Sequence, residues 1–450
     1  MRHGRQNSCI HTQDTAVCNR RQKQIVCHTL ESKHTDSCCG WLQLQWCQDT
    51  SHTVHLDNTT PQALLISFTG TDRPGLTAAI AAFLAERGVP LLDVEQVLVE
   101  GQLTLNLLVD EDEARLRPSL LFEADALKVQ VTLRTVDRAH PQAKAARHSW
   151  AVTLLAPQVS ADMLATATRY ASARGFAIDR IHRLSDAGLL SIELLLSAAD
   201  GAGDDAGLKQ DLLQMQALLG CDVALQPEGL MRRSKRLVVM DMDSTLIQQE
   251  VIDELARKHG VFDRVAEITH RAMNGELQFD DALRERVMLL RGAPASILED
   301  VQSVIHLTPG AEHLIRVLKR LGYRLAVISG GFIEVAEPIR ARLGLDYAFA
   351  NQLEIVDGKL TGKVLGAIVN RKRKAELLEE IAQIERVSLE QVIAIGDGAN
   401  DLDMLNRAGL GIAFNAKQVV REQAKYVVNQ RNLDAILYLL GIRDVEARAI

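Results

Sequence analysis

The residues best suited to chemistry begin with two aspartates at the end of a predicted buried strand. The apolar run Leu237–Asp241 leads directly to Asp243, so two carboxylates stand two positions apart. Strand geometry would place both side chains on one face, and the following turn would let them diverge. Such a pair can supply a nucleophile and a general acid–base. Because a strand that ends in a polar turn often has this spacing, the pair gains weight only from its neighbours.

Two further segments suit an anion. The predicted strand Arg324–Ser329 is followed by Gly330 and another glycine, which combines a hydroxyl donor with backbone N–H groups that can approach a phosphate closely. Lys374 stands just before a predicted helix over 375–383, where an ammonium group and a helix N-terminus would act together. The alternatives are an ordinary β-turn for the first segment and a solvated basic stretch for the second.

One more segment suits a hard cation. The predicted strand Val392–Gly396 is followed by Asp397, Asn400 and Asp401. Carboxylate and amide oxygens are the ligands that Mg²⁺ prefers. The alternative interpretation is an Asx-rich turn with a capping aspartate.

Residues 236–450 supply the elements that would bring these segments together. Short apolar runs alternate with helical stretches, which predicts a parallel sheet with helical crossovers. A long helical insert, about 249–306, would lie over the carboxyl ends of the strands, where ligands bind in open α/β sheets. The predicted strands are Leu237–Asp241, Arg324–Ser329, Val392–Gly396, Leu410–Ala413 and Tyr426–Val428.

Taken together, the motifs resemble those of the haloacid dehalogenase superfamily, in its phosphatase branch. The resemblance covers roughly residues 236–440 and consists of D-x-D, S-G, a lysine and G-D-x-x-N-D in that order. Haloalkanoic dehalogenases of the superfamily lack the second aspartate, so the presence of Asp243 implies phosphoryl transfer. The family implies that Asp241 forms an aspartyl-phosphate and that Asp243 first donates and then removes a proton.

The same resemblance implies a ligand set. A phosphomonoester dianion repels an aspartate nucleophile, so a cation and N–H donors must offset that repulsion. Mg²⁺ is expected on Asp241, the backbone carbonyl of Asp243 and Asp397, with Asp401 supporting that shell. The groups expected to bind the phosphate and the substrate are Ser329, Gly330, Lys374 and Asn400.

The helical insert resembles the cap of phosphoserine phosphatases. By that resemblance, Glu250 receives the substrate ammonium and Arg286 grips its carboxylate, while Met273 and Phe279 wall the pocket. An arginine gives a carboxylate a two-pronged grip that a lysine cannot give. The alternative is that Glu250 and Arg286 are exposed charges on amphipathic helices.

The expected activity is therefore hydrolysis of O-phospho-L-serine to L-serine and phosphate, the last step of L-serine biosynthesis. Two alternatives remain open at this point. One is a phosphatase for another small phosphomonoester. The other is an amino-acid-sensing regulatory protein whose phosphatase fold is not catalytic.

The front of the chain shows a duplicated pattern. Residues 61–136 and 149–227 each read as β-α-β-β-α-β, the ferredoxin-like order, with a period of about 85 residues. The first copy has the turn Gly70-Thr-Asp-Arg-Pro-Gly75 and resembles an ACT domain, a module that binds amino acids. The second copy has Ala156-Pro-Gln-Val-Ser160 instead and is degenerate. The resemblance implies an L-serine effector at these domains and a homodimer formed through them.

The predicted fold class is thus α/β: a Rossmann-like parallel-sheet catalytic domain with a helical cap, preceded by two ferredoxin-like (ACT) α+β domains. The 450 residues carry a net charge of −7 and are 47% hydrophobic, which argues against bulk disorder and against a nucleic-acid protein that works by a basic surface. No apolar run reaches the roughly 18 residues of a membrane span, and no secretory signal is evident. We therefore expect a cytoplasmic protein without nucleic-acid or membrane partners.

Residues 1–60 fit none of these domains. Six of the seven cysteines lie there, without the closely paired spacing that zinc modules show. A metal-binding segment is one interpretation. The favoured ones are a disordered tail and upstream sequence translated in error.

Overall fold

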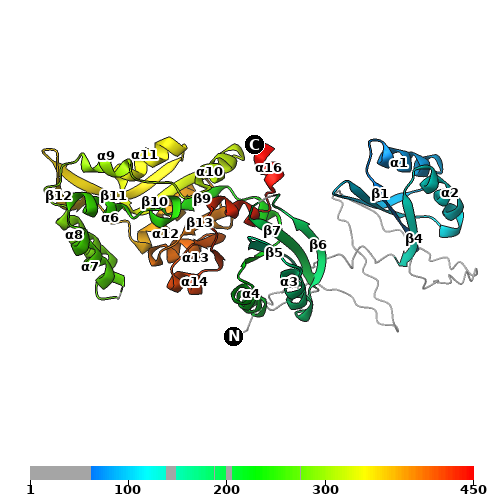
Figure 1. Ribbon diagram of the computed structural model, residues 1–450, viewed down its shortest axis with the longest axis horizontal. Helices are drawn as coiled ribbons and strands as arrows, with labels where there is room; N and C mark the ends of the chain where they lie inside the picture. The colour runs from blue at the N-terminus through cyan, green and yellow to red at the C-terminus, as the bar shows by residue number, and fades with distance from the viewer. Residues whose placement is uncertain (1–61, 138–147, 187, 199–204, 274, 450) are drawn as a thin grey trace, which may run out of the picture. The chain divides into compact units, whose positions relative to one another are not determined.

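The computed structural model describes residues 62–137, 148–186, 188–198, 205–273 and 275–449 (Figure 1). The cysteine-rich segment 1–60 lies outside the described residues. The chain divides at Asp137 into two units. No helix in the described ranges is long and apolar enough to span a membrane.

The first unit is a four-stranded antiparallel sheet with two helices. Its strand order is β2-β3-β1-β4, which is the ferredoxin-like arrangement that the sequence predicts. Alternate residues of the first strand, such as Leu64, Ile66 and Phe68, are buried in the core beneath the helices. The elements are β1 (Gln62–Thr71), α1 (Leu76–Glu86), β2 (Leu91–Val99), β3 (Gln102–Val109), α2 (Glu113–Ala126) and β4 (Gln130–Asp137).

Helix α2 continues through a proline. The helix begins at Glu113 because the carboxylate of Asp112 accepts a hydrogen bond from the Ala114 amide at 2.9 Å and so caps the first turn. Pro118 lies inside the helix. The buried side chains of Leu116 and Leu120 anchor the turns on either side of it, so packing offsets the missing amide.

The second unit begins with another copy of the same domain, which confirms the predicted duplication. Its strand order, β6-β7-β5-β8, matches that of the first copy strand for strand. The elements are β5 (His148–Ala156), α3 (Ala161–Ala173), β6 (Ala177–Arg183), β7 (Leu190–Ala198), α4 (Asp205–Leu219) and β8 (Asp222–Pro227).

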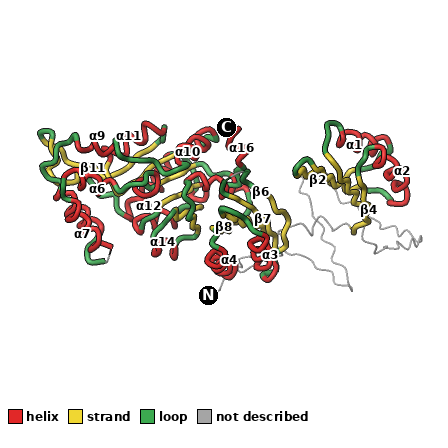
Figure 2. Tube along the Cα trace, in the orientation of Figure 1, coloured by secondary structure: helices red, strands yellow, loops and turns green. Residues whose placement is uncertain are grey.

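The rest of the second unit is a seven-stranded sheet covered by helices on both faces (Figures 1 and 2). Residues of the central strand alternate between the two sides: Val238 packs with α10 and α11, while Val239 packs with α12 and α13. The strand order is β12-β11-β10-β9-β13-β14-β15. The strands are β9 (Leu237–Met240), β10 (Arg324–Phe332), β11 (Tyr347–Val356), β12 (Lys359–Leu365), β13 (Val392–Gly396), β14 (Leu410–Phe414) and β15 (Tyr426–Val428). The helices are α10 (Ala311–Arg320), α11 (Ile333–Leu343), α12 (Arg371–Ile384), α13 (Leu402–Arg407), α14 (Gln418–Gln423), α15 (Ile436–Leu439) and α16 (Asp444–Ala449).

Two strands of this sheet have no counterpart in the sequence prediction. β11 extends the parallel sheet beside β10, and β12 returns antiparallel at the edge, so the sheet is mixed. The sequence YAFANQLEIV begins with a short apolar run that Asn351 and Gln352 interrupt, so it gives only a weak strand signal. Pairing with β10, rather than local preference, therefore decides its conformation.

The predicted insert forms a helical cap. It consists of α6 (Val251–His259), α7 (Phe262–Met273), α8 (Phe279–Leu289) and α9 (Ile297–Gln302). Helix α8 contacts β12, and apolar residues such as Leu255 and Val287 join the main core cluster of the sheet. The cap is thus packed against the sheet rather than tethered to it.

The second ferredoxin-like domain shares a core with the seven-stranded sheet. Leu155 and Ala224, from its own sheet, belong to the same buried cluster as Leu439. Around this contact Arg232, in the short helix α5 (Leu230–Arg233), is buried between Glu193 and Glu228. The ion pairs of this buried guanidinium tie α5 to β7 and to the end of β8, and its contact with the Leu439 carbonyl at 3.5 Å reaches the seven-stranded-sheet domain.

Removing that guanidinium by Arg232→Ala should lower the free energy of unfolding by about 3–5 kcal/mol, because Glu193 is left buried without its cation. Arg233 is the matched control. It pairs with the same Glu228, but its side chain is 64% exposed, so Arg233→Ala should cost less than about 1 kcal/mol. Urea unfolding followed by circular dichroism measures both. Equal losses in the two variants would contradict a role for burial.

Candidate active site

The first aspartate of the D-x-D motif lies at the centre of the catalytic sheet. Asp241 directly follows β9, and its amide donates to the carbonyl of Ile395 at 2.9 Å, which ties it to the neighbouring β13. Its carboxylate accepts the amide of Met242 at 2.7 Å and the ammonium of Lys374 at 2.8 Å. Burial and repulsion from Asp401 raise the pKa of Asp241 well above its usual range, although Lys374 opposes that shift.

Lys374 is completely buried and lies between two acids. Its Nζ is 2.8 Å from Oδ1 of Asp241 and 2.7 Å from Oδ1 of Asp401. Burial lowers the pKa of Lys374, but the two carboxylates more than offset this, so its pKa lies above the ordinary value. A solvated basic stretch is therefore the wrong interpretation for this residue. Helix α12, capped by the side chain of Asn370, fixes the ammonium in place.

The second aspartate turns away from the first. Ser244 has a φ of 55°, and this left-handed turn redirects the chain after the strand. Asp243 accepts hydrogen bonds from the Val251 amide and from the Ser329 hydroxyl, each at 2.8 Å. Burial and the nearby Glu250 raise the pKa of Asp243 to about 6. Its carboxyl group can therefore exchange a proton near neutral pH.

The serine-glycine segment lies against both the motif and the cap. Gly331 donates its amide to Ser329 Oγ at 2.7 Å, which orients the hydroxyl toward Asp243. A Cβ on Gly331 would come within 2.6 Å of Asp243 Oδ2, and a Cβ on Gly330 within 3.0 Å of the Phe279 ring. A side chain at Gly331 would therefore displace the Asp243 carboxylate, and one at Gly330 would press against the Phe279 ring.

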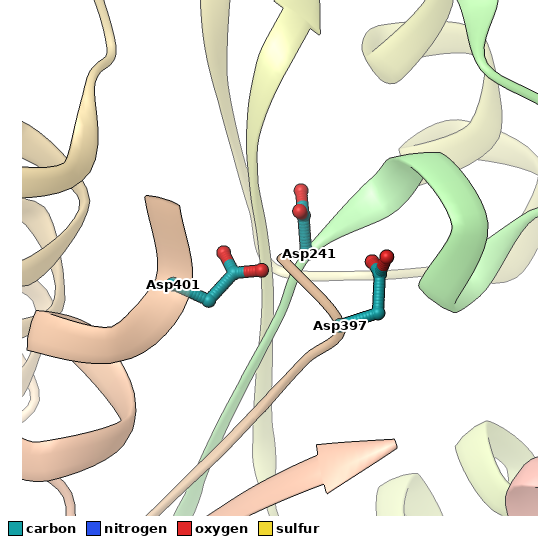
Figure 3. A group of neighbouring side chains, drawn as sticks. All are labelled: Asp241, Asp397 and Asp401. Atoms are coloured by element: carbon teal, nitrogen blue, oxygen red, sulfur yellow. The ribbon is translucent and has the colours of Figure 1, made fainter. Parts of the chain in front are cut away.

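Three carboxylates converge at the edge of the sheet (Figure 3). One oxygen from each of Asp241, Asp397 and Asp401 lies within 4.8 Å of the others. Burial and repulsion from Asp401 raise the pKa of Asp397 to about 7, while the hydroxyl of Thr245 donates to it at 2.9 Å. Clustered, mutually repelling oxygen donors fit a hard divalent cation. The oxygens of Asp401 already face Lys374 and the Gly398 amide, which suits a supporting role.

The cap residues lie near this edge. Glu250 is exposed and accepts the Ser244 hydroxyl at 2.8 Å. Arg286 is partly buried, and it donates to the Ala282 carbonyl at 3.2 Å. Burial lowers the pKa of Arg286, an effect that the nearby Glu250 partly offsets. Phe279 faces Gly330, as noted above, whereas the Met273 side chain lies outside the described part of the structure.

Three polar residues at the site were absent from the sequence prediction. Thr245 orients Asp397, and Asn370 both caps α12 and donates to Asp280 of the cap at 3.1 Å. Asn351, in the unpredicted β11, donates to the Gly330 carbonyl at 2.8 Å. Thr245 stands inside the motif and could have been found there. Asn370 could also have been found as a helix cap, because its Oδ1 accepts the nearby Arg373 amide. The partners of Asn351 and the contact of Asn370 with Asp280 are distant in sequence, so no local pattern indicates them.

Family comparisons match each predicted part of the chain. A haloacid dehalogenase-like hydrolase model matches residues 238–406, and ACT domain models match residues 62–134 and 148–226. These matches confirm the predicted fold class. Among solved structures, a probable phosphoserine phosphatase from Vibrio cholerae is 34% identical and has a TM-score of 0.52. That match covers 67% of this chain and 89% of the other.

Two relatives extend over most of the chain. A phosphoserine phosphatase of Streptomyces coelicolor is 46% identical over 391 residues, which covers 86% of this chain and 94% of the relative. The phosphoserine phosphatase SerB2 of Mycobacterium tuberculosis is 42% identical over 392 residues, which covers 86% and 95%.

Because the ammonium of Lys374 lies between two buried acids, we predict that its removal causes a pH-dependent loss of stability. Lys374→Met leaves two buried carboxylates without a cation, so the free energy of unfolding at pH 7.5 should fall by about 3–5 kcal/mol. The folded variant then holds a carboxyl proton more tightly than the unfolded chain, whose aspartates have a pKa of about 3.9. Its deficit should therefore shrink as the pH falls from 7.5 toward 5. Urea titrations in a metal-free buffer measure this.

Lys235→Met is the matched control for this prediction. Lys235 is also buried, but its ammonium donates to the backbone carbonyl of Glu390, and burial lowers its pKa. Its removal leaves no unpaired charge, so the loss should be smaller. It should not shrink on acidification as the Lys374→Met loss does. A pH-independent deficit in Lys374→Met would overturn the electrostatic account.

Proposed function

The chain belongs to the phosphoserine phosphatase family, and from that premise we propose that it hydrolyses O-phospho-L-serine to L-serine and phosphate through an aspartyl-phosphate. The observation that carries the proposal is the buried Lys374 bonded to Asp241, next to an Asp243 that is poised to exchange a proton. An oriented nucleophile and a proton donor at one strand end are what this reaction needs.

The first half-reaction transfers the phosphoryl group to the protein. A carboxylate oxygen of Asp241 attacks phosphorus while the bond from phosphorus to the serine oxygen breaks. Asp243, in its protonated form, gives its proton to the departing oxygen, and L-serine leaves. Lys374 holds Asp241 in place and opposes the rise in the pKa of that carboxyl group, and its charge offsets the repulsion between the carboxylate and the phosphoryl oxygens.

The second half-reaction restores the protein. Asp243, now ionised, removes a proton from water as the water oxygen attacks phosphorus. The bond to Asp241 breaks, and phosphate is released. A pKa of about 6 lets Asp243 serve as acid and then as base near neutral pH, because neither form is strongly disfavoured.

The groups around the phosphoryl oxygens are also part of the proposal. The hydroxyl of Ser329, the backbone of Gly330, Lys374 and Asn400 surround the position that this substrate group would take. An imaginary Cβ on Gly330 lies 3.7 Å from Asn400 Nδ2, so the amide reaches the same place. Glycines permit this close approach, which supports anion binding rather than an ordinary β-turn.

Mg²⁺ is the proposed cofactor, held by Asp241, the backbone carbonyl of Asp243 and Asp397, with Asp401 supporting them. The oxygen-only donor set and the raised pKa of Asp397 support this assignment. When bound, the ion would neutralise negative charge on the phosphoryl group and lower the pKa values of the carboxylates that hold it.

The cap would select the substrate. We assign the carboxylate of phosphoserine to Arg286 and its ammonium to Glu250, with Phe279 and Met273 as walls of the pocket. Burial strengthens the interaction of Arg286 with an anion, and its planar guanidinium can bond both carboxylate oxygens. This arrangement favours phosphoserine over phosphomonoesters that lack an amino-acid head group.

The remaining proposals concern the whole molecule. An L-serine effector would bind an ACT-like domain, and the first copy keeps the turn for it: Gly75 has a φ of 89°, which favours glycine. Homodimerisation has support in β2, an edge strand with exposed apolar residues such as Val94 and Leu98. The place in L-serine biosynthesis and the cytoplasmic location stay predictions.

The nucleophile assignment predicts the effect of Asp241→Asn. Turnover of L-phosphoserine should fall at least about 10⁴-fold, because an amide oxygen cannot form the aspartyl-phosphate efficiently. Phosphate release measures it, with intact mass used to exclude deamidation, and a chelator should abolish release by the unaltered protein. Full activity of a variant verified as asparagine would overturn the mechanism, while inactivity of the unaltered protein would favour the non-catalytic sensor.

The substrate assignment predicts that kcat/KM is higher for phosphoserine than for phosphothreonine and falls about 100-fold or more in Arg286→Ala for phosphoserine. Arg284 in the same helix is a matched control, since it is exposed and pairs only with Asp281 among the described contacts. Arg284→Ala should keep kcat/KM. A phosphomonoester without a head group, p-nitrophenyl phosphate, should be hydrolysed equally by both variants. If Arg286→Ala leaves phosphoserine hydrolysis unchanged, a different small phosphomonoester is the substrate.

A further inference from the structure

Asn351 is a fully buried amide beneath the site, on the strand β11. β10 and β11 pair in parallel up to Ile328 and Phe349, and the pairing resumes only at Phe332 and Asn351. The residues in between, Ser329 to Gly331, leave the ladder. The chain bulges there toward Asp243, and the bulge removes regular strand partners from its peptide groups.

The side chain of Asn351 replaces those partners. Its Nδ2 donates to the carbonyl of Gly330 at 2.8 Å and to that of Gly331 at 3.2 Å. Buried carbonyls need donors, and one amide group satisfies both. Both carbonyls of the serine-glycine segment are therefore held by a single side chain.

The other end of the same amide reaches a second segment of the site. Oδ1 of Asn351 accepts the backbone amide of Val369 at 2.8 Å. Val369 immediately precedes Asn370, the residue that caps α12, and α12 carries Lys374. Asn351 thus joins the segment that presents Ser329 to the helix that presents Lys374.

We propose that Asn351 is a positioning residue for phosphoryl transfer, which sets Ser329 and Lys374 at their correct separation around the phosphoryl group. The inference rests on the proposed function, since it takes Ser329 and Lys374 as the groups that bind the phosphoryl group. Asn351 itself does not reach the reacting atoms; it acts through the backbone of Gly330 and Gly331 and through the start of α12.

Among side chains of this length, only an amide can make all three hydrogen bonds. The two carbonyls accept and cannot donate, and the Val369 amide donates and cannot accept, so the position needs two hydrogens at one end and an oxygen at the other. An aspartate keeps the acceptor for Val369 but has no N–H donors for the glycine carbonyls. Alanine removes all three hydrogen bonds.

The test compares Asn351→Ala with a matched control, Gln226→Ala. Gln226 is also a buried amide that donates to a backbone carbonyl, that of Leu439 at 2.8 Å, but it lies at the boundary with the second ACT-like domain. We expect kcat for phosphoserine to fall about 100-fold in Asn351→Ala, as small misplacements of reacting groups do, and to stay within about threefold in Gln226→Ala. Thermal unfolding confirms that both variants are folded.

Two further measurements separate positioning from a general loss of structure. The fall in kcat should be the same for phosphoserine and p-nitrophenyl phosphate, because the phosphoryl group is common to both, and KM for phosphoserine should stay within about threefold because the cap is intact. Asn351→Asp keeps the acceptor for the Val369 amide, so its fold should be less disturbed than that of Asn351→Ala. It should nevertheless show the same loss of kcat.

Each outcome decides the matter. A folded Asn351→Ala or Asn351→Asp with kcat near that of the unaltered protein overturns the proposal. So does failure of both variants to fold while Gln226→Ala folds, since Asn351 would then serve the fold alone. If the unaltered protein hydrolyses p-nitrophenyl phosphate but not phosphoserine, the substrate proposal fails, and the comparison on p-nitrophenyl phosphate still tests Asn351.

Discussion

The arrangement of the catalytic domain depends on one ammonium shared between two carboxylates. Lys374 has no exposed surface, so its charge is separated from water and must be balanced by Asp241 and Asp401. The ammonium in turn stabilises the acids, because four carboxylates lie close enough to repel one another: Asp241, Asp243, Asp397 and Asp401. Charge balance therefore fixes three chain segments against one another, and the geometry of the site follows from it.

The sheet makes this balance possible. β9 and β13 are parallel neighbours, so Asp241 and Asp397 leave the same edge although 156 positions separate them. Glycines keep the adjoining space open: a Cβ on Gly396 would lie 2.5 Å from Cγ of Asp401. Backbone register determines where the carboxylates meet, and the absence of side chains at a few positions lets them meet closely.

Some features of the site are determined by neighbouring residues in the sequence and others by distant ones, and this difference explains what the sequence could predict. Asp241, Asp243, Asp397 and Asp401 stand beside short apolar runs, so strand ends and motif spacing located them without any coordinates. The partners of Lys374 could not be inferred that way, because Asp241 and Asp401 lie on segments that follow β9 and β13, whereas Lys374 is in α12. β11 was missed for the same reason: polar residues such as Asn351 break its pattern, and Asn351 contacts β10 and Val369, just ahead of α12. Prediction succeeded where the signal was local and failed where a distant partner determined the residue.

The two ACT-like domains show how the same fold can acquire different physical roles. The first keeps Gly75 in a left-handed turn ahead of its helix, whereas in the second copy Ser160 caps α3 through a side-chain hydrogen bond to the Met163 amide. The second copy also contributes Leu155 to the core of the catalytic domain, so one face of its sheet is already covered. On that face the buried hydroxyl of Thr153 has no hydrogen-bond partner among the described residues, a cost that apolar packing must offset. A sheet face used as a domain boundary is closed to a ligand, so on that face the second copy serves the packing of the catalytic domain.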